Sequence, residues 1–588
     1  MTRLVSRWNR EVVVSIVLLS AGVLLIYTYE LGSALSLYYD EVYFAIQANA
    51  IAATGRDTSG RLLPFYFEAT SGSWFQPAVV YVTALFLQVL PLSETALRLP
   101  TVVVSLLNVI LMYLIARRIF ERSSWALVAG AGLMLMPAHV IFGRLGLSYL
   151  YPVLFLEAWL LGLMIFLERE RSWLLVLATT CLGFGFYTYI AAVAMMPLYL
   201  AVTCLVLWVR YDRPWTLAAL AALGFAWPVL LSVPFHLSHP DVFFQKIGTY
   251  GPSGVGGRSL DPLQHASELL NYNNFSYRVS LFFSFFNPGY LFMNGAGNPA
   301  NSTRRAGVFL MPLALLIPVG MYHLLRSRRT IVNVVVFAGF VTAPLAASLV
   351  AESEAADREL EVLPFGVLLA TFGVQYLWSA PLTVRLRSLC TPVALAGGLT
   401  GITYALWTLA RRGSISGATP MLIVASAAIY ILGRASDATR QWRPIAACLL
   451  LLGALQFQSF YRDYLTDYPI RSAGWFMNNR RGAIEEIVKR EDPRHPVKVL
   501  VSTNILYADS YWTLYTSMFK RDDLRFEMSY FDPERTRIED VPDGVLVLAS
   551  TTAGSDQAFA AHPQLVTVAS IPEIDGASAF VLLEKRSK

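Results

Sequence analysis

Charged side chains are scarce in this chain. Of its 588 residues, 15% are charged and 55% are hydrophobic, whereas soluble globular proteins carry about 25% charged residues. So few charges cannot cover the water-facing surface of a protein of this length. The composition therefore excludes an ordinary soluble protein and predicts that much of the surface faces lipid.

Cysteine is also rare. The four cysteines lie within apolar segments, and the hydrophilic C-terminal region has none; they are Cys181, Cys204, Cys390 and Cys448. Disulfide frameworks and zinc sites use cysteines at short, paired spacings in polar regions. This distribution excludes a disulfide-stabilised C-terminal region and a zinc site built on paired cysteines.

The chain has no basic stripe for nucleic acid, although its net charge is +6. Its Lys and Arg residues form short clusters between apolar runs, which is the positive-inside pattern of membrane proteins. We therefore expect no nucleic-acid partner.

The apolar runs that remain are long and numerous. The first, residues 12–29, follows Arg3, Arg7 and Arg10 and continues into Glu30 without a small-residue cleavage site. It is therefore predicted to be an uncleaved signal anchor with a cytoplasmic N-terminus. Residues 77–90 are too few to span a bilayer, which takes about 20 apolar residues, and predict an interfacial or re-entrant helix.

Alternating the remaining runs across the membrane places most basic clusters in the cytoplasm, with one pair, Arg411 and Arg412, on the wrong side. The thirteen predicted crossings are residues 12–29, 96–116, 124–142, 147–166, 172–189, 190–209, 215–233, 306–325, 330–349, 361–379, 389–409, 419–433 and 444–460. Residues 1–460 thus form a transmembrane domain. Its two large loops, 30–95 and 234–304, lie outside the cytoplasm.

The tail, residues 461–588, differs in character and is predicted to be an extracytoplasmic domain. Helix-like periodicity over 472–490 precedes four short β-rich runs, which are Val497–Ser502, Gly544–Ser550, Leu565–Ile571 and Ala579–Glu584. Strands interleaved with helical segments predict a small α/β domain.

Asp40 and Glu41 directly follow the first crossing. A carboxylate that is partly desolvated near the bilayer surface can act as a general base toward an acceptor hydroxyl or amine. The pair can equally cap the helix that begins there, because acidic residues stabilise helix N-termini. The dipeptide leaves both interpretations open.

A series of short motifs extends this observation over roughly the first 370 residues. The Asp-Glu pair is followed by an alanine-rich helix that ends in Gly55. The further motifs, in order, are Pro77-Ala78-Val79-Val80-Tyr81, Ala96-Leu97-Arg98-Leu99-Pro100, Phe142-Gly143-Arg144, Asn294-Gly295-Ala296-Gly297-Asn298-Pro299 and Arg358 to Pro364. In content and order they resemble the C-fold (GT-C) glycosyltransferases that use polyprenyl-phosphate sugars. This superfamily includes protein O-mannosyltransferases and lipid A aminoarabinose transferases.

The resemblance implies a membrane glycosyltransferase of the bacterial inner-membrane type. Such an enzyme transfers a hexose or pentose from a polyprenyl-phosphate carrier to a lipid, glycan or protein outside the cytoplasm, with inversion. Asp40 would be the general base, and Glu41 would support it through acceptor or lipid contacts.

The donor phosphate requires cations on the outer side, and arginine suits this role because it binds phosphate in bidentate fashion. The candidates are Arg144, Arg358, Lys246, Arg304 and, with them, Arg305. Each of these residues can instead be an interfacial anchor or a headgroup contact.

Two departures from the family pattern affect its implied ligands. Ala296 stands where the family has an acid, and Phe75-Gln76 stands where the aminoarabinose branch has Glu-Lys. A metal ligand and a phosphate-binding lysine are therefore missing. These changes argue against aminoarabinose transfer and weaken the case for a divalent metal. The sequence thus identifies no certain cofactor, and a divalent metal stays open as an alternative.

Two alternatives remain open. A polytopic transporter or lipid-linked-sugar flippase would place charged groups at mid-membrane, and Glu157 is the clearest such residue. A non-catalytic assembly subunit could share the fold, although the Asp40-Glu41 pair argues against it. His236, His239 and Asp241 are close in sequence, but they follow Pro234 in a loop and are expected to face solvent rather than bind metal.

Overall fold

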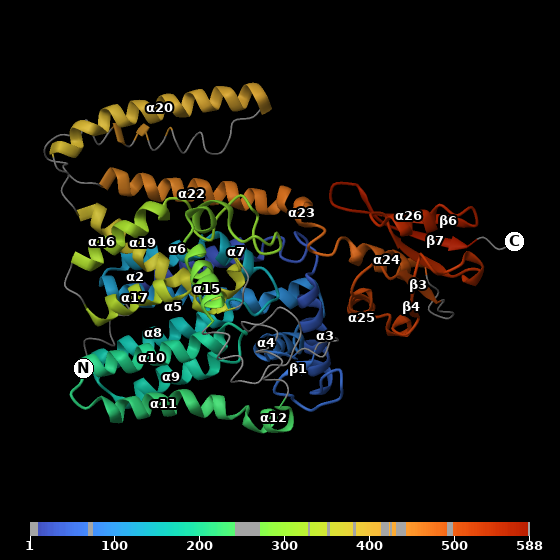
Figure 1. Cartoon of the computed structure of the whole chain (residues 1–588), viewed down its shortest axis with the longest axis horizontal. Coiled ribbons are helices and arrows are strands. Elements are labelled where there is room, and N and C mark those ends of the chain that lie inside the picture. The colour runs from blue at the N-terminus through green and yellow to red at the C-terminus, as the bar shows by residue number, and fades with distance from the viewer. Residues whose placement is uncertain are drawn as a thin grey trace.

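A computed structural model of the chain describes residues 10–68, 74–240, 271–326, 330–349, 353–379, 384–412, 443–490 and 498–585, with isolated positions between 423 and 430. It contains a large helical bundle and a smaller domain that includes a β-sheet, joined by α22 (Arg443–Leu465) and α23 (Asp467–Ser472) (Figure 1). The predicted fold class, a helical membrane domain with a C-terminal α/β domain, is confirmed.

The first part of the bundle contains α2 (Arg10–Thr28), α3 (Tyr39–Thr54), α4 (Ala78–Leu87), α5 (Glu94–Phe120), α6 (Ser123–Met134), α7 (Pro137–Gly143), α8 (Tyr151–Arg169), α9 (Ser172–Gly185), α10 (Ala192–Arg210), α11 (Pro214–Leu230) and α12 (Val233–Ser238). A two-stranded antiparallel sheet, β1 (Phe67–Glu68) and β2 (Trp74–Phe75), lies between α3 and α4. The second part contains α15 (Tyr272–Ser284), the π-helix η1 (Gly289–Asn294), α16 (Leu313–Arg326), α17 (Ile331–Thr342), α18 (Leu345–Leu349), the 3₁₀ turn η2 (Ala356–Arg358), α19 (Val362–Ser379) and α20 (Val384–Arg412).

Within the described ranges, seven helices are long and apolar enough to span a bilayer, or up to eight if the bent pair α6 and α7 forms one span. The chain is therefore a multi-pass membrane protein, while the count of thirteen crossings stays a prediction. A short helix is present in the predicted place as the ten-residue α4, and its position at the membrane interface stays a prediction. Predicted crossing 419–433 lies mostly outside the described residues.

The predicted crossing 124–142 is not a straight helix. It bends by 60° between α6 and α7, where Met136 is extended and Pro137 occupies the start of α7. The proline explains the break, because it disfavours helical geometry in the preceding residue and cannot continue the hydrogen-bond ladder.

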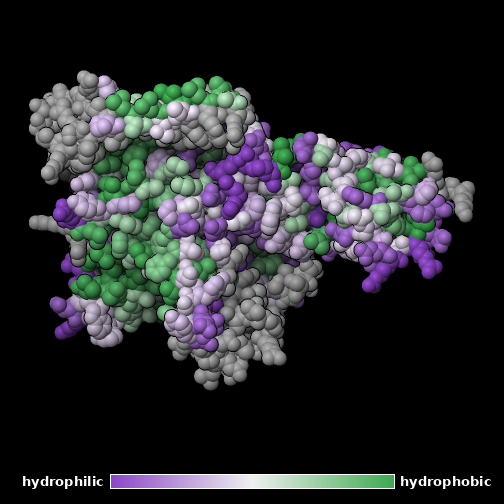
Figure 2. Space-filling model, turned by 45° about the horizontal axis from the view of Figure 1, so that its top comes forward, coloured by the Kyte–Doolittle hydropathy of each residue, from purple (hydrophilic) through white to green (hydrophobic). Residues whose placement is uncertain are grey.

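On the face shown in Figure 2, the surface of the bundle is largely apolar, and hydrophilic residues gather mainly toward the C-terminal domain and on that domain. Large side chains such as Leu25, Leu205 and Trp208 are more than half exposed on the spanning helices. A water-facing protein rarely exposes a continuous apolar surface of this kind, and a lipid-facing one does.

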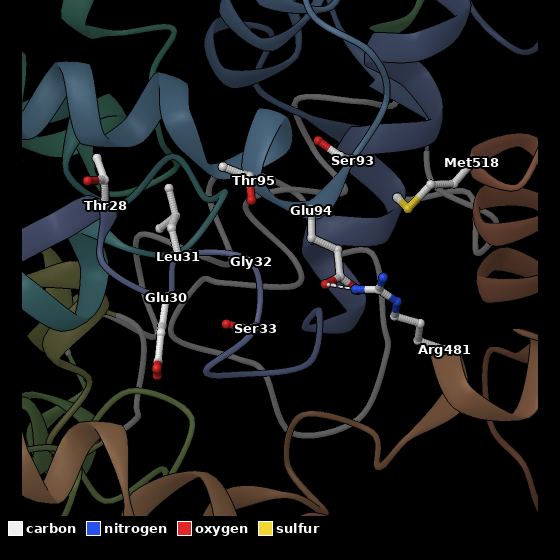
Figure 3. Close-up of a pocket in the computed structure, with 10 residues that line it drawn as sticks. All are labelled: Thr28, Glu30, Leu31, Gly32, Ser33, Ser93, Glu94, Thr95, Arg481 and Met518. Carbon is white, nitrogen blue, oxygen red and sulfur yellow. Dashed lines mark hydrogen bonds and ion pairs between the residues drawn. The ribbon is translucent and has the colours of Figure 1, made fainter.

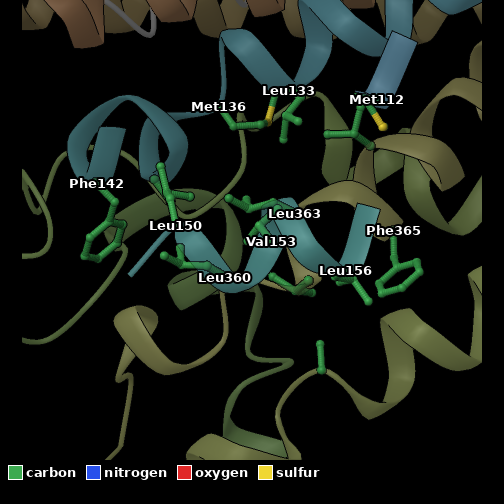
Figure 4. Packing of buried hydrophobic residues seen from close by; sticks show 14 of the residues in the cluster. Met112, Leu133, Met136, Phe142, Leu150, Val153, Leu156, Leu360, Leu363 and Phe365 are labelled. Atoms are coloured by element: carbon green, nitrogen blue, oxygen red, sulfur yellow. The ribbon is translucent and has the colours of Figure 1, made fainter. Parts of the chain in front are cut away.

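The bundle core forms where α5, α6, α8 and α19 meet. Met112, Leu133, Leu156, Leu363 and Phe365 are buried there in one contiguous cluster (Figure 4). Gly320 of α16 allows α16 and α19 to approach closely, because a Cβ at this position would lie 1.8 Å from the Leu369 carbonyl oxygen. Small residues commonly permit such backbone contacts between membrane helices.

Gly320→Ala is expected to push α16 and α19 apart and to destabilise the protein by about 1–3 kcal/mol, as overpacking does elsewhere. The readout is the thermal unfolding temperature of purified protein in detergent. Gly453→Ala on α22 is the control, because a Cβ there would meet its nearest atom at 3.9 Å. Equal unfolding temperatures for the two variants would contradict the close packing.

The C-terminal domain contains α24 (Arg480–Arg490), β3 (Val499–Ser502), α25 (Ala508–Met518), η4 (Asp522–Leu524), β4 (Met528–Phe531), η5 (Ile538–Asp540), β5 (Leu546–Ser550), α26 (Gly554–Ala560), β6 (Leu565–Pro572) and β7 (Ser578–Lys585). Its strands form one sheet in the order β4-β3-β5-β7-β6. Strands β3, β4 and β5 are parallel, and β7 is antiparallel to its neighbours β5 and β6.

The four predicted strands are confirmed, and β4 was not predicted. The helix predicted over 472–490 begins only at Arg480. Met477 and Asn478 adopt positive φ angles of 62° and 58°. These left-handed residues interrupt the helix between α23 and α24.

This domain packs directly on the first loop of the bundle. Leu37, Val42 and Leu97 share one buried cluster with Ile484 and Trp512 of the C-terminal domain. The elements of the first loop therefore lie between the bundle and the C-terminal domain, which positions the site described next.

Candidate active site

Glu41, in the first turn of α3, lies in a fully satisfied buried position. Its carboxylate accepts two bonds from Arg98 of α5, from Nε at 2.8 Å and from Nη2 at 2.9 Å. It also accepts the main-chain N–H groups of Tyr38 at 2.8 Å and Gly146 at 2.6 Å. Glu41 is thus the residue that caps α3, one of the two roles that the sequence left open.

Arg98 extends the same network along the first loop. Its guanidinium donates to the carbonyls of Leu31 and Leu35 through Nη1 and of Ser36 through Nη2, at 3.0, 2.9 and 2.9 Å. Arg98 and Glu41 are only 1% and 2% exposed. A buried pair is tolerated at such a position because its remaining donors and acceptors are satisfied. The loop between α2 and α3 is held in one conformation as a result.

Arg98→Met is expected to destabilise the protein by about 3–5 kcal/mol, because it leaves the Glu41 charge buried without its partner. Thermal unfolding in detergent measures the loss. The double variant Glu41→Leu/Arg98→Met should lose less than the sum of the two single variants, since both charges are removed. Additive losses would show that the pair is not energetically coupled.

Asp40, the adjacent carboxylate, has different surroundings. It is partly buried and accepts a hydrogen bond from Tyr149, in the turn before α8. Burial raises the pKa of Asp40 to about 7, with further increases from the negative charges of Asp357 and Glu41. A carboxyl group with this pKa can exchange a proton near neutral pH, as a general base must.

Asp357 comes to this place from η2, more than 300 residues along the chain. It accepts hydrogen bonds from Tyr189 Oη at 2.6 Å and Asn301 Nδ2 at 3.2 Å, and lies 3.7 Å from Arg358 Nε. The structure therefore brings two of the predicted site residues, Asp40 and Arg358, to one place through Asp357. Arg358 supplies the positive charge beside this pair of carboxylates.

Two more acidic groups follow Asp357 in the chain. Glu359 and Glu361 are 1% and 2% exposed, and Glu359 accepts a 2.9 Å hydrogen bond from Tyr290 Oη. Burial raises the pKa of Glu361 to about 7 and that of Glu359 well above its usual range. This segment is consequently a buried acidic turn next to the candidate site.

The other predicted cations have other partners. Arg144 is 2% exposed and donates to the carbonyls of Ile26, Tyr27 and Tyr29 at the end of α2, at 2.8, 3.1 and 2.7 Å. These contacts describe a residue that caps α2, and its phosphate-binding role stays a prediction.

Arg304 donates to the Ala296 carbonyl at 2.8 Å and pairs with Glu354 at 3.4 Å. Arg305 pairs with Asp463 at 2.7 Å and with Asp467 at 3.1 Å, so it links this loop to α22 and α23. Lys246 lies outside the described residues. Arg304 and Arg305 thus form ion pairs with acidic side chains of the protein. Their role in binding phosphate also stays a prediction.

The histidines of the second large loop lie among aromatic rings. His239 stacks on Phe235 at 4.6 Å and contacts Trp74 at 5.3 Å, and His236 lies 5.4 Å from Tyr66. Asp241 is outside the described residues. Among the residues that the structure describes, no three His, Cys, Asp or Glu side chains are grouped as a metal site would need.

A separate cavity of about 410 Å³ lies between the end of α2, the start of α5 and the C-terminal domain. Figure 3 shows Glu94 and Arg481 facing each other across its edge, joined by a 2.9 Å ion pair. Asp40 does not line it. The candidate site and this cavity are therefore distinct features.

The sequence identified Asp40 and Arg358 but missed most of their neighbours. Tyr149, Tyr189 and Asn301 come from three different turns, and nothing in their local sequence sets them apart from other interfacial polar residues. One signal was available: Asp357 stands beside the predicted Arg358, at the entrance to α19.

Comparison with known proteins supports this architecture. The family model described as dolichyl-phosphate-mannose-protein mannosyltransferase matches residues 76–231. The structure is similar to that of ArnT from Cupriavidus metallidurans bound to undecaprenyl phosphate, with a TM-score of 0.59, 15% identity, and 97% of this chain and 98% of that chain covered. For the apo state of the same ArnT the TM-score is 0.56, with 14% identity and coverage of 96% and 97%. No curated protein sequence matches the chain.

Both chains are covered almost end to end, so the likeness includes the C-terminal domain as well as the bundle. The chain therefore has the same overall fold as ArnT, and this fold agrees with the resemblance found in its motifs.

Proposed function

We propose that this protein is a membrane glycosyltransferase that transfers a sugar from a polyprenyl-phosphate carrier to an acceptor outside the cytoplasm. The observation that carries the proposal is Asp40. It is a proton-accepting carboxylate with a pKa of about 7, held beside Asp357 and Arg358 within a C-type fold. The family model matched by residues 76–231 is also named for a polyprenyl-type phosphate sugar.

The donor enters this site from the bundle. Its lipid tail lies along the apolar surface between helices, and its phosphate is held at the outer end, where Arg358 provides a cation. Arginine remains charged in a partly dry site and can donate two parallel hydrogen bonds to phosphate oxygens. Stabilisation of the departing phosphate is the main electrostatic requirement of the reaction.

Asp40 removes the proton of the acceptor hydroxyl. The acceptor oxygen then forms a bond to the anomeric carbon, and the bond from that carbon to the phosphate oxygen breaks with inversion. Glu41 does not contact the reacting atoms in this scheme. It fixes the start of α3 through Arg98, so that Asp40 points at the acceptor with little freedom.

A divalent metal does not fit the residues that are present. Ala296 replaces the acid expected in the 294–299 turn. Asp357 already accepts hydrogen bonds from Tyr189 and Asn301 and lies 3.7 Å from Arg358 Nε. We therefore assign no reaction step to a metal.

The location that suits this reaction is a bacterial-type inner membrane, with the N-terminus in the cytoplasm and the C-terminal domain outside. The first loop and the C-terminal domain pack together in one cluster, so both belong on the same side. The positive-inside pattern places that side outside the cytoplasm.

Asp40→Asn is expected to lower kcat for sugar transfer by about 10²–10⁴-fold, because it removes the general base. The assay follows labelled sugar from a panel of polyprenyl-phosphate donors, with purified wild type and variant side by side. Glu68→Gln is the control, since this first-loop carboxylate is 41% exposed. Full turnover by a folded Asp40→Asn protein would exclude the assigned base, and a wild type that consumes no donor would exclude the proposed function.

The pH dependence provides an independent check of the base. Since Asp40 must be deprotonated, kcat/KM should fall as pH drops through about 7, the pKa of Asp40. Asp357→Asn removes a negative charge that raises this pKa and should move the acidic limb to lower pH. A limb that stays in place would show that the observed pKa belongs to another group.

One observation favours the flippase alternative. Glu157 of α8 is fully buried, and within the described chain neither of its carboxylate oxygens has a hydrogen-bond partner. Buried acids in spanning helices often mark ion or substrate paths. Translocation of a lipid-linked sugar across vesicles, lost in Glu157→Gln but retained in Asp40→Asn, would support that function instead.

A further inference from the structure

The C-terminal domain is attached rigidly at the candidate site. Tyr511 Oη donates to the Leu37 carbonyl at 2.6 Å, three residues before Asp40. Glu94, at the start of α5, accepts from Tyr515 Oη at 2.6 Å and pairs with Arg481 at 2.9 Å. Contacts from both α24 and α25 therefore fix the domain against the two segments that also carry Glu41 and Arg98.

Tyr507, directly before α25, is the residue that this attachment brings next to the site. Its ring stacks on that of Tyr39 with centroids 5.1 Å apart and an angle of 15°, and meets Tyr43 edge-on at 6.3 Å. Tyr39 and Tyr43 flank Asp40 in sequence. Tyr507 nevertheless remains accessible to a ligand, because 38% of the residue is exposed.

The backbone of Tyr507 is strained. Its φ of 57° lies in the left-handed region, which aromatic residues rarely adopt. Such conformations persist where surrounding structure holds them, and they concentrate at ligand-binding sites. In this conformation the ring of Tyr507 stacks on that of Tyr39.

Asp40 has neighbours from two parts of the structure. From the bundle, it accepts a hydrogen bond from Tyr149 and lies near the charge of Asp357, and Arg358 stands next to Asp357. From the C-terminal domain, Tyr507 stacks on Tyr39, the residue directly before Asp40 in α3. A donor whose tail lies in the membrane reaches Asp40 from the bundle, so a group that arrives along the C-terminal domain is the acceptor.

We propose that Tyr507 and Tyr39 form an aromatic wall that binds a sugar ring of the acceptor next to Asp40. Tyrosine combines a flat apolar ring face with a polar tip, which matches the C–H face and the hydroxyl groups of a pyranose. The acceptor class is therefore a glycan or glycolipid rather than a peptide or a plain lipid. This inference rests on the proposed transferase function and makes Tyr507 a specificity-determining residue.

The test compares acceptors that carry a sugar with acceptors that carry none. Octyl glycosides of several hexoses, n-octanol and a serine-containing peptide are offered with a donor that the wild type consumes. Donor hydrolysis, with water as acceptor, is measured in parallel. Phe526→Ala is the matched control, because this aromatic residue of the same domain is 85% exposed and takes no part in the wall.

The wild type should prefer octyl glycosides to octanol and peptide. Tyr507→Ala should raise the KM for the glycoside by about tenfold, the effect of losing one aromatic contact, a larger effect than on donor hydrolysis, while Phe526→Ala should change neither. Tyr507→Trp should restore the KM, which a purely structural role would not require.

Three outcomes would overturn the inference. They are no preference for glycosides in the wild type, an unchanged glycoside KM in Tyr507→Ala, or an equal loss of transfer and hydrolysis. Each leaves the proposed function standing, because donor hydrolysis by the wild type is scored separately. Failure of the wild type to consume any donor would refute both proposals.

Discussion

The buried pair of Glu41 and Arg98 is the interaction on which the end of the bundle next to the C-terminal domain depends. Two charges that are almost fully removed from water are stable only if nearly every donor and acceptor is used. Here that requirement recruits main-chain groups of the first loop, the start of α3 and the turn at Gly146. One pair thereby joins three segments that the sequence separates, and the geometry around Asp40 follows from it.

The same pair separates the roles of two adjacent carboxylates. Glu41 accepts four strong hydrogen bonds, which hold it as a structural anion. Asp40, one residue earlier on the helix, has other neighbours: it accepts a hydrogen bond from Tyr149 and lies near the negative charge of Asp357. Neighbouring groups whose surroundings differ in this way commonly divide into a fixed charge and a proton-transfer group. The proposed chemistry needs this division.

The C-terminal domain packs against the segments that form the candidate site. Its helices α24 and α25 contact the first loop and α5 through both buried apolar side chains and hydrogen bonds. Since the domain and the bundle share one packed interface, Tyr507 is held beside the loop that carries Asp40. The C-terminal domain thus contributes to a place that is otherwise built from the bundle and its first loop.

The sequence by itself determined the membrane class, the α/β tail, the short α4 and the position of Asp40 and Glu41 at a helix start, because apolar run length, residue periodicity and helix capping are local properties. It did not reveal β4, the break before α24 or the cap formed by Arg144. Only the tertiary structure decided that Glu41 pairs with Arg98 and that Asp357 stands beside Asp40. The second of these contacts joins residues more than 300 positions apart. The packing of helices, which no local pattern encodes, brings such residues together.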